Sequence, residues 1–354
     1  MKKLRTKILC TIGPSSRSER VLRGLIREGI DGLRINLSHT NLEESLAIIK
    51  TVRKISRTIP IIIDSQGKET RLRGLEKPTV LAVRKQVRII PEDAASEQHA
   101  GLAISRTEVF KVLREGDSIF VDDNSIHLRI EKIHRSPLVI DCVVLKAGTL
   151  GAPKNIRIAR AIELKDPLTP RDKEVVKKLK PYGIHGFALS YVGSANDMKR
   201  TRKLVGGQLP LMAKIETPTA IKNLDEIIKA SDSILIDRND LGTEIGYEKI
   251  PLVQKFVIAK SKAIGKPIFV ATHLLETMIA KEKPTRGEVN DVINTVLDGV
   301  TGLVLSSETA VGKDPVKIVK TLKKLVAQAE FVLDRQASGN IHSVIERLKD
   351  LRYI

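Results

Sequence analysis

The segment LPLMAKIETPT, residues 209–219, ends an apolar run with two charged side chains, Lys214 and Glu216. Residues two apart on a β-strand point to the same face, so this pair shares the face expected to be buried. An ammonium group can balance the charge of a phosphoryl group, and a carboxylate can bind a divalent cation. The segment therefore predicts a strand that ends at a polar site suited to phosphoryl transfer. We expect Lys214→Met to abolish turnover and leave the fold intact, because the strand end would face solvent.

Several other predicted strands also end in polar residues. These residues are Arg34, Asn36 and Ser38; Asp64 and Ser65; Asp240; Thr272; and Ser306 and Glu308. Each has an ordinary explanation when taken singly: Asp64 or Ser38 could cap a helix, and Arg34 could pair with a neighbouring carboxylate. The same pattern at six strands favours one shared site, because the ordinary explanations would have to hold independently at every strand.

Two cation sites are predicted from these groups. Glu216 and Asp240 lie on neighbouring predicted strands and supply the hard oxygen ligands that Mg²⁺ prefers. Lys214 and Arg34 would neutralise charge on the transferring phosphoryl group. A second, all-oxygen cluster suits a monovalent cation: Asn36, Ser38, Asp64 and Ser65. The sequence contains no G-x-x-x-x-G-K-[ST] motif, which excludes a P-loop enzyme.

The elements that must position these residues alternate between strands and helices. Short β-like runs are predicted at 7–13, 32–38, 59–65, 183–190, 209–216, 232–240, 266–272 and 302–308. Amphipathic segments separate most of them, which predicts a parallel sheet. Eight such strands close a (β/α)₈ TIM barrel, and in that fold the carboxyl ends of all strands converge on one mouth.

One long interruption separates the third and fourth predicted strands. Its sequence alternates polar and apolar residues and carries turn signals, which is typical of a small β-rich, β-barrel-like domain inserted into a loop of the barrel. The predicted organisation is a barrel domain in two parts (1–66 and 169–334), an inserted β-rich domain (67–168) and a helical tail (335–354).

Composition limits the class of protein. The chain has 354 residues, 42% of them hydrophobic, and no apolar run long enough to span a bilayer. Cys10 and Cys142 both fall in predicted strands, which favours reduced cysteines and a cytoplasmic location. The net charge of +19 could attract RNA or DNA, but aromatic residues make up only 3%. A basic surface serving small anionic ligands is the favoured interpretation, with nucleic-acid binding as a possible side activity.

Nine segments together resemble the pyruvate kinase family, in order along the chain to about residue 330. They are TKILCTIGPSS, LRINLSHT, IIIDSQGKETR, GTLG, MAKIETPTAIKNLDEII, DRNDLGTEI, KPIFVATHLLETMI, PTRGEVNDV and SSETAVGKDPV. The resemblance implies a barrel interrupted by a β-rich domain. It also implies the transfer of phosphate from phosphoenolpyruvate to ADP, giving pyruvate and ATP, with Mg²⁺ (or Mn²⁺) and K⁺.

The resemblance also implies roles for individual residues. Lys214 would stabilise phosphoryl transfer and the enolate, and Thr272 would help to protonate the enolate. The substrate set is Arg34, Lys214, Asn239, Asp240 and Thr272, and the nucleotide set is Arg34, His39, Arg71 and Arg171. Glu216 and Asp240 would hold the divalent metal, and Asn36, Ser38, Asp64 and Ser65 would hold potassium. The family's C-terminal effector domain has no counterpart here, so the resemblance implies a truncated form and a homodimer through the barrel.

The sequence departs from the family motifs around the expected mouth. Asn239 replaces the glycine of RGDLG, Gln66 and Lys68 replace the lysine and proline of DTKGPE, Gly193 and Ser194 replace two basic residues of SFVRK, Ser307 replaces a glycine, and His273 replaces a glutamine. These changes leave two alternatives open. One is a paralogue acting on another enol phosphate or 2-oxo acid, and the other is a non-catalytic regulatory or RNA-binding protein.

Overall fold

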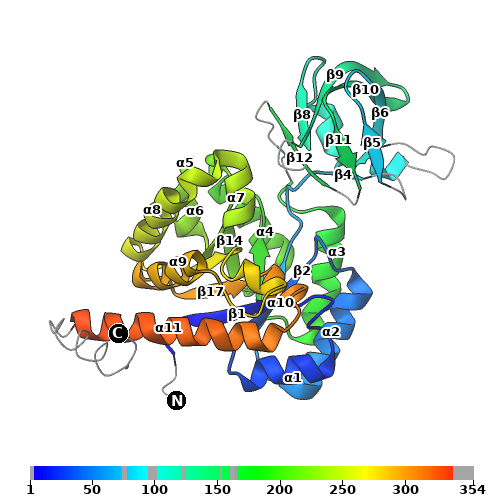
Figure 1. Ribbon diagram of the computed structural model, residues 1–354. Coiled ribbons are helices and arrows are strands. Elements are labelled where there is room, and N and C mark those ends of the chain that lie inside the picture. Colours follow the sequence, from blue (N-terminus) through cyan, green and yellow to red (C-terminus); the bar gives the residue numbers. More distant parts are fainter. Residues whose placement is uncertain are drawn as a thin grey trace. The chain divides into compact units, whose positions relative to one another are not determined.

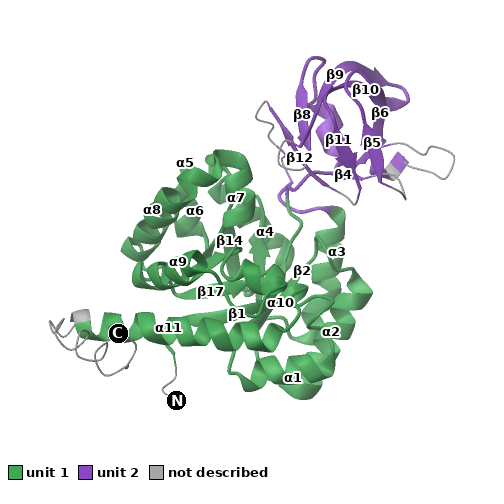
Figure 2. Ribbon diagram, viewed as in Figure 1, with its two compact units in different colours: residues 1–67, 170–354 green, residues 68–169 purple. Residues whose placement is uncertain are grey.

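The computed structural model describes residues 4–73, 78–94, 102–121, 125–151, 154–159, 164 and 166–337. The chain divides into two compact units, shown in different colours in Figure 2. Unit 1 comprises residues 1–67 and 170–354, and unit 2 comprises residues 68–169. The sequence predicted the inserted domain at 67–168, one residue earlier at each end. The predicted tail helix after residue 337 lies outside the described residues.

Unit 1 contains a closed barrel of eight parallel strands, as the alternation of strands and helices predicted (Figure 1). Around the barrel the order is β1-β17-β16-β15-β14-β13-β3-β2. The strands are β1 (Lys7–Thr11), β2 (Gly32–Asn36), β3 (Ile61–Asp64), β13 (Gly186–Leu189), β14 (Leu211–Ile215), β15 (Ser233–Asp237), β16 (Ile268–Ala271) and β17 (Gly302–Leu305). Inside the barrel, apolar side chains from these strands pack into one core: Leu9, Ala188, Met212, Leu235, Phe269, Ala271 and Val304.

Helices surround the barrel and connect its strands. They are α1 (Glu19–Arg27), α2 (Leu42–Ile55), α3 (Pro170–Leu179), α4 (Ala195–Val205), α5 (Pro218–Lys222), α6 (Leu224–Ala230), α7 (Arg238–Ile245), α8 (Ile250–Ala263), α9 (Arg286–Leu297), α10 (Ser307–Ala310) and α11 (Pro315–Ala337). Capping boxes at Asn41, Ser194 and Thr285 fix the starts of α2, α4 and α9. None of the described helices has the length and hydropathy required of a membrane span.

Every predicted barrel strand ends one to three residues earlier than expected, and the difference at β15 affects the site. The sequence favoured a strand through residues 232–240, but β15 ends at Asp237 and α7 begins at Arg238. Asp240 therefore lies in the first turn of α7, where a negative charge complements the positive end of the helix dipole. This shift makes Asp237 the residue at the strand end.

Unit 2 is a second, all-β barrel with strand order β10-β6-β7-β4-β12-β8-β9, accompanied by the two-stranded sheet β11-β5. Its strands are β4 (Arg71–Arg73), β5 (Thr79–Leu81), β6 (Gln86–Pro91), β7 (Leu102–Ile104), β8 (Ser118–Val121), β9 (Ile126–Arg135), β10 (Leu138–Lys146), β11 (Gly148–Leu150) and β12 (Lys154–Ile158). Its core includes Ile89, Phe110, Ile119, Leu128 and Cys142. Cys142 and Cys10 are both buried free thiols.

Candidate active site

Lys214 lies at the end of β14 and is buried among carboxylates. Its Nζ is 2.7 Å from Glu216 Oε1, 3.3 Å from Asp237 Oδ2 and 3.4 Å from Asp64 Oδ2. It also donates a hydrogen bond of 3.0 Å to Ser190 Oγ. The side chain is only 4% exposed, so the expectation of a solvent-facing ammonium group is wrong. The lysine is the shared counter-ion of an acidic cluster.

Arg34, in the middle of β2, is the second cation of the site. Its Nε and Nη2 lie 2.6 and 2.5 Å from Asp64 Oδ2, and Nη2 lies 3.8 Å from Asp237 Oδ2. Its Nη1 donates to Thr11 Oγ1 and Ser306 Oγ, at 3.1 and 3.2 Å. The guanidinium group pairs with a carboxylate, as the ordinary explanation allowed, and it also faces the interior of the barrel mouth.

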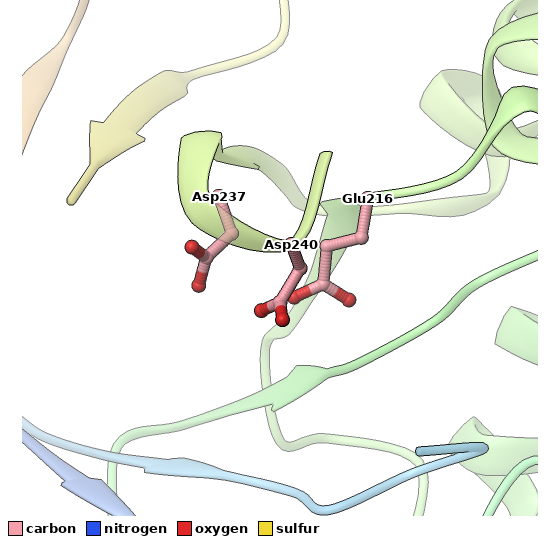
Figure 3. Close-up of side chains that lie close together, drawn as sticks. All are labelled: Glu216, Asp237 and Asp240. Carbon is pink, nitrogen blue, oxygen red and sulfur yellow. The ribbon is translucent and has the colours of Figure 1, made fainter. Parts of the chain in front are cut away.

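Three carboxylates from two neighbouring strand ends come together in the site (Figure 3). Glu216 follows β14, Asp237 ends β15, and Asp240 is in α7. One oxygen of each lies within 4.8 Å of the others. Tyr191 holds two of the groups, because its backbone N–H donates to Glu216 Oε2 at 2.6 Å and its hydroxyl donates to Asp240 Oδ1 at 3.1 Å.

The charges in this cluster shift the protonation equilibria of its members. Burial, with the nearby Asp240 and Asp237 carboxylates, holds the pKa of Glu216 well above its usual range, although Lys214 opposes the shift. Burial would lower the pKa of Lys214, but Asp64, Glu216 and Asp237 outweigh it and raise that pKa. Burial would raise the pKa of Asp237, but Lys214 and Arg34 outweigh it and lower that pKa.

A divalent cation fits this group of side chains. Asp237 Oδ1 is buried and has no hydrogen-bond partner among the described residues. Buried polar atoms are normally satisfied, so an orphaned carboxylate oxygen in a cluster of three acids indicates a missing positive partner. All three groups offer the oxygen ligands that Mg²⁺ and Mn²⁺ take.

The predicted monovalent-cation residues come together at the ends of β2 and β3. Asn36 and Asp64 are paired in the strand register, and the Asn36 side chain accepts from the Ser38 N–H at 2.9 Å. Ser65 Oγ accepts from the Ser190 N–H at 3.1 Å, and the Ser190 hydroxyl donates to the Ser65 carbonyl at 2.8 Å. The four oxygen-bearing residues thus occupy adjacent positions.

Thr272 follows β16 in a strained backbone conformation. Its φ is +69° and that of His273 is +52°, a region that is costly for a β-branched residue such as threonine. Arg238 clamps the Thr272 carbonyl through Nε at 3.0 Å and Nη2 at 2.5 Å, and pairs with Asp291 at 2.7 Å. The Thr272 hydroxyl oxygen accepts from the Asn239 N–H at 3.0 Å. Strain at this position is therefore maintained by a specific set of hydrogen bonds.

The predicted nucleotide-binding residues fall in both units. In unit 1, His39 is exposed after β2, and Arg171 in α3 donates to the carbonyl of the adjacent Thr40 at 3.0 Å. Arg71 belongs to β4 of unit 2, where its Nη2 lies 2.9 Å from Glu69 Oε1. His39 and Arg171 are thereby brought close to one another in the fold.

Glu308 has a different role from the one its strand-end position suggested. Its Oε1 accepts from the N–H groups of Leu274 and Leu275 at 3.0 and 3.3 Å, and its Oε2 accepts from the Ser306 N–H at 2.7 Å. The buried carboxylate therefore fixes the loop after β16.

Sequence reasoning missed Ser190, Tyr191 and Asp237. Asp237 carried a signal, because it is the charged residue that ends the apolar run SILID, but it was counted as part of a longer strand. Ser190 and Tyr191 follow β13 at its carboxyl end, where the position on the barrel could have indicated them.

Three comparisons with known proteins all match most of this chain to pyruvate kinases. The family model described as pyruvate kinase, barrel domain, matches residues 3–319. A pyruvate kinase of Thermococcus litoralis is 35% identical over 352 residues, which cover 97% of this chain and 74% of the relative. A pyruvate kinase of Thermotoga maritima is 34% identical, covering 93% and 72%. The solved structure of a pyruvate kinase from Cryptosporidium parvum has a TM-score of 0.80 and 31% identity, covering 94% of this chain and 71% of that one.

Proposed function

This chain belongs to the pyruvate kinase family and is a pyruvate kinase-like phosphotransferase, and we propose that it transfers the phosphoryl group of phosphoenolpyruvate to ADP. In this reaction the enol phosphate P–O bond breaks and a P–O bond to the β-phosphate of ADP forms. The released enolate takes a proton at its methylene carbon and becomes pyruvate. The observation that carries the proposal is the cluster in which Lys214 and Arg34 face three carboxylates, those of Asp64, Glu216 and Asp237, at one barrel mouth.

The chain's own residues would supply charge and orientation. Lys214 and Arg34 would bind the phosphoryl oxygens and stabilise the charge that spreads over them in the transition state. Thr272 would approach the reacting end of the substrate, and its hydroxyl would assist protonation of the enolate. The Asn239 backbone, which lies beside Thr272, would bind the substrate carboxylate. His39, Arg71 and Arg171 would bind the nucleotide.

Metal ions complete the proposal. Glu216 and Asp240 would hold Mg²⁺ or Mn²⁺, which when bound acts as a Lewis acid toward the phosphoryl and enolate oxygens. Asn36, Ser38, Asp64 and Ser65 would hold K⁺. We also propose a homodimer through unit 1, which the exposed apolar side chains on α8 support. A cytoplasmic location is a further part of the proposal, supported by the two buried free cysteines.

A second candidate is a paralogue that acts on another enol phosphate or on a 2-oxo acid. The observation in its favour is a chain of three exposed side chains beside Thr272. In this chain His273 Nε2 lies 3.2 Å from Asn239 Oδ1, and His273 Nδ1 lies 2.6 Å from Glu276 Oε2. This hydrogen-bonded chain places side-chain atoms next to the proposed carboxylate-binding position, where they could select a differently shaped acid.

An assay of the purified chain tests both candidates. Pyruvate formation, measured with a coupled dehydrogenase, is expected from phosphoenolpyruvate and ADP and should be lost when Mg²⁺ and K⁺ are removed. Lys214→Met provides the matched inactive control. A panel of other enol phosphates and 2-oxo acids decides between the candidates. Inactivity with phosphoenolpyruvate across nucleotides and metals, with turnover of another panel member, would replace the first candidate by the second.

A further inference from the structure

Asp237 is a buried carboxylate that has no role in the reaction proposed above. It ends β15, whose register against β14 pairs Ile236 with Ile215, so that Asp237 lies beside Glu216. The residue is 2% exposed. Its Oδ2 faces the two cations, at 3.3 Å from Lys214 Nζ and 3.8 Å from Arg34 Nη2. Its Oδ1 has no solvent contact and no hydrogen-bond partner among the described residues.

Other carboxylates lie closer to the two cations than Asp237 does. Arg34 approaches Asp64 much more closely, at 2.5 Å, and Lys214 is closest to Glu216, at 2.7 Å. The carboxylates of Asp64, Glu216 and Asp237 face these two cations, and Asp240 lies beside Glu216 and Asp237. Four carboxylates and two cations have a formal charge of −2 when all are ionised. Burying that excess charge is unfavourable without a further cation.

We propose that Asp237 is a third protein ligand of the divalent cation, in addition to Glu216 and Asp240. Asp237 has an oxygen, Oδ1, without a hydrogen-bond partner among the described residues. One carboxylate oxygen of each of the three residues lies within 4.8 Å of the others, and the three side chains lie close together in Figure 3. A divalent ion would also cancel the formal charge of −2. The inference rests on the proposed function in so far as both place a metal at this site.

A consequence distinguishes this site from one with two protein carboxylates. Affinity for a hard cation rises with the number of charged ligands, so the third carboxylate should let the protein hold the metal before nucleotide or substrate arrives. Substrate phosphates, which otherwise complete the ligand shell of such a cation, would not be needed for its retention.

Binding of Mn²⁺ alone to the full chain tests the proposal, using the electron paramagnetic resonance signal of the free ion without substrates. The wild-type protein should bind one Mn²⁺, and Asp237→Asn should weaken that binding at least about ten-fold. Asp237→Ser serves as a second variant, and Asp240→Asn as a positive control. Asp225→Asn, which changes an exposed carboxylate on α6, should leave the affinity unchanged. Circular dichroism and melting temperature establish that each variant is folded.

Asp237 could instead act only by positioning Lys214. Measuring the effect of Asp237→Asn in a protein that also carries Lys214→Met separates the two roles. If Asp237 is a ligand, Asp237→Asn should weaken Mn²⁺ binding by a similar factor when Lys214 is already methionine. An effect that disappears in the Lys214→Met background would overturn the ligand assignment, as would equal Mn²⁺ affinity in wild type and both Asp237 variants. The pyruvate-coupled assay of the wild-type chain tests the proposed reaction separately.

Discussion

Lys214 combines a proposed catalytic role with a structural one, because it is buried against Asp64, Glu216 and Asp237. Its replacement by methionine leaves those carboxylates without their shared cation. Breaking a buried ion pair by removing one partner typically costs about 3–5 kcal/mol. The structure therefore predicts both loss of turnover and loss of stability for Lys214→Met.

We expect Lys214→Met to lower the free energy of unfolding by roughly that amount, about 3–5 kcal/mol, in the presence of EDTA. Urea denaturation followed by circular dichroism measures the change, and added Mn²⁺ should restore part of the loss by supplying positive charge. Lys229→Met, at an exposed position on α6, is the matched control and should change stability little. Equal stability of wild type and Lys214→Met in EDTA would contradict this view of the cluster.

At the scale of elements, the loop after β16 is held in its strained form from outside. Arg238, at the start of α7, binds the Thr272 carbonyl with two nitrogen atoms, and Glu308 binds the N–H groups of Leu274 and Leu275. A strained backbone persists only where the surroundings determine it. Arg238 thus links the start of α7 to the conformation of the loop after β16.

Arg238→Met should allow Thr272 to relax. Strain of this kind is worth about 1–3 kcal/mol, which corresponds to a kcat about 5- to 150-fold lower if Thr272 is displaced from its productive position. Steady-state kinetics on phosphoenolpyruvate and ADP measure this, with a smaller effect expected on the KM for ADP. Asp291→Asn, which alters only the outer partner of Arg238, should have a weaker effect. A kcat unchanged in Arg238→Met would show that the clamp is dispensable.

At the scale of the whole molecule, unit 1 displays an apolar surface on one helix. Leu252 and Phe256 are one turn apart on α8 and are 73% and 46% exposed, and Tyr247, in the preceding short helix Tyr247–Lys249, is 83% exposed. A cluster of exposed large apolar side chains is typical of an interaction surface. A second copy of the chain is the partner that the proposed homodimer requires.

Leu252→Glu should convert the proposed dimer into a monomer, because it places a charge at the centre of this surface. Size-exclusion chromatography with light scattering gives the mass directly. Leu204→Glu is the matched control, since Leu204 on α4 is also 51% exposed but lies on another helix. A wild-type chain that is monomeric at micromolar concentration, or a dimer that survives Leu252→Glu, would contradict the prediction.

The sequence by itself determined the barrel, the inserted β-rich unit and the convergence of Arg34, Lys214, Glu216 and Thr272. Alternating strands and helices specify a parallel sheet, and the carboxyl ends of parallel strands must meet on one side of it. Those conclusions depend on periodicity and order, which are properties of the chain itself.

Only the tertiary structure decided how the charged groups pair. The end of β15 at Asp237, the burial of Lys214 and the attachment of Glu308 to backbone N–H groups depend on strand register and on where α7 begins. Partners in these contacts come from segments far apart in the sequence, as Arg34 and Ser306 do. Local pattern places such residues at a strand end, but packing around the closed barrel determines which atoms come within bonding distance.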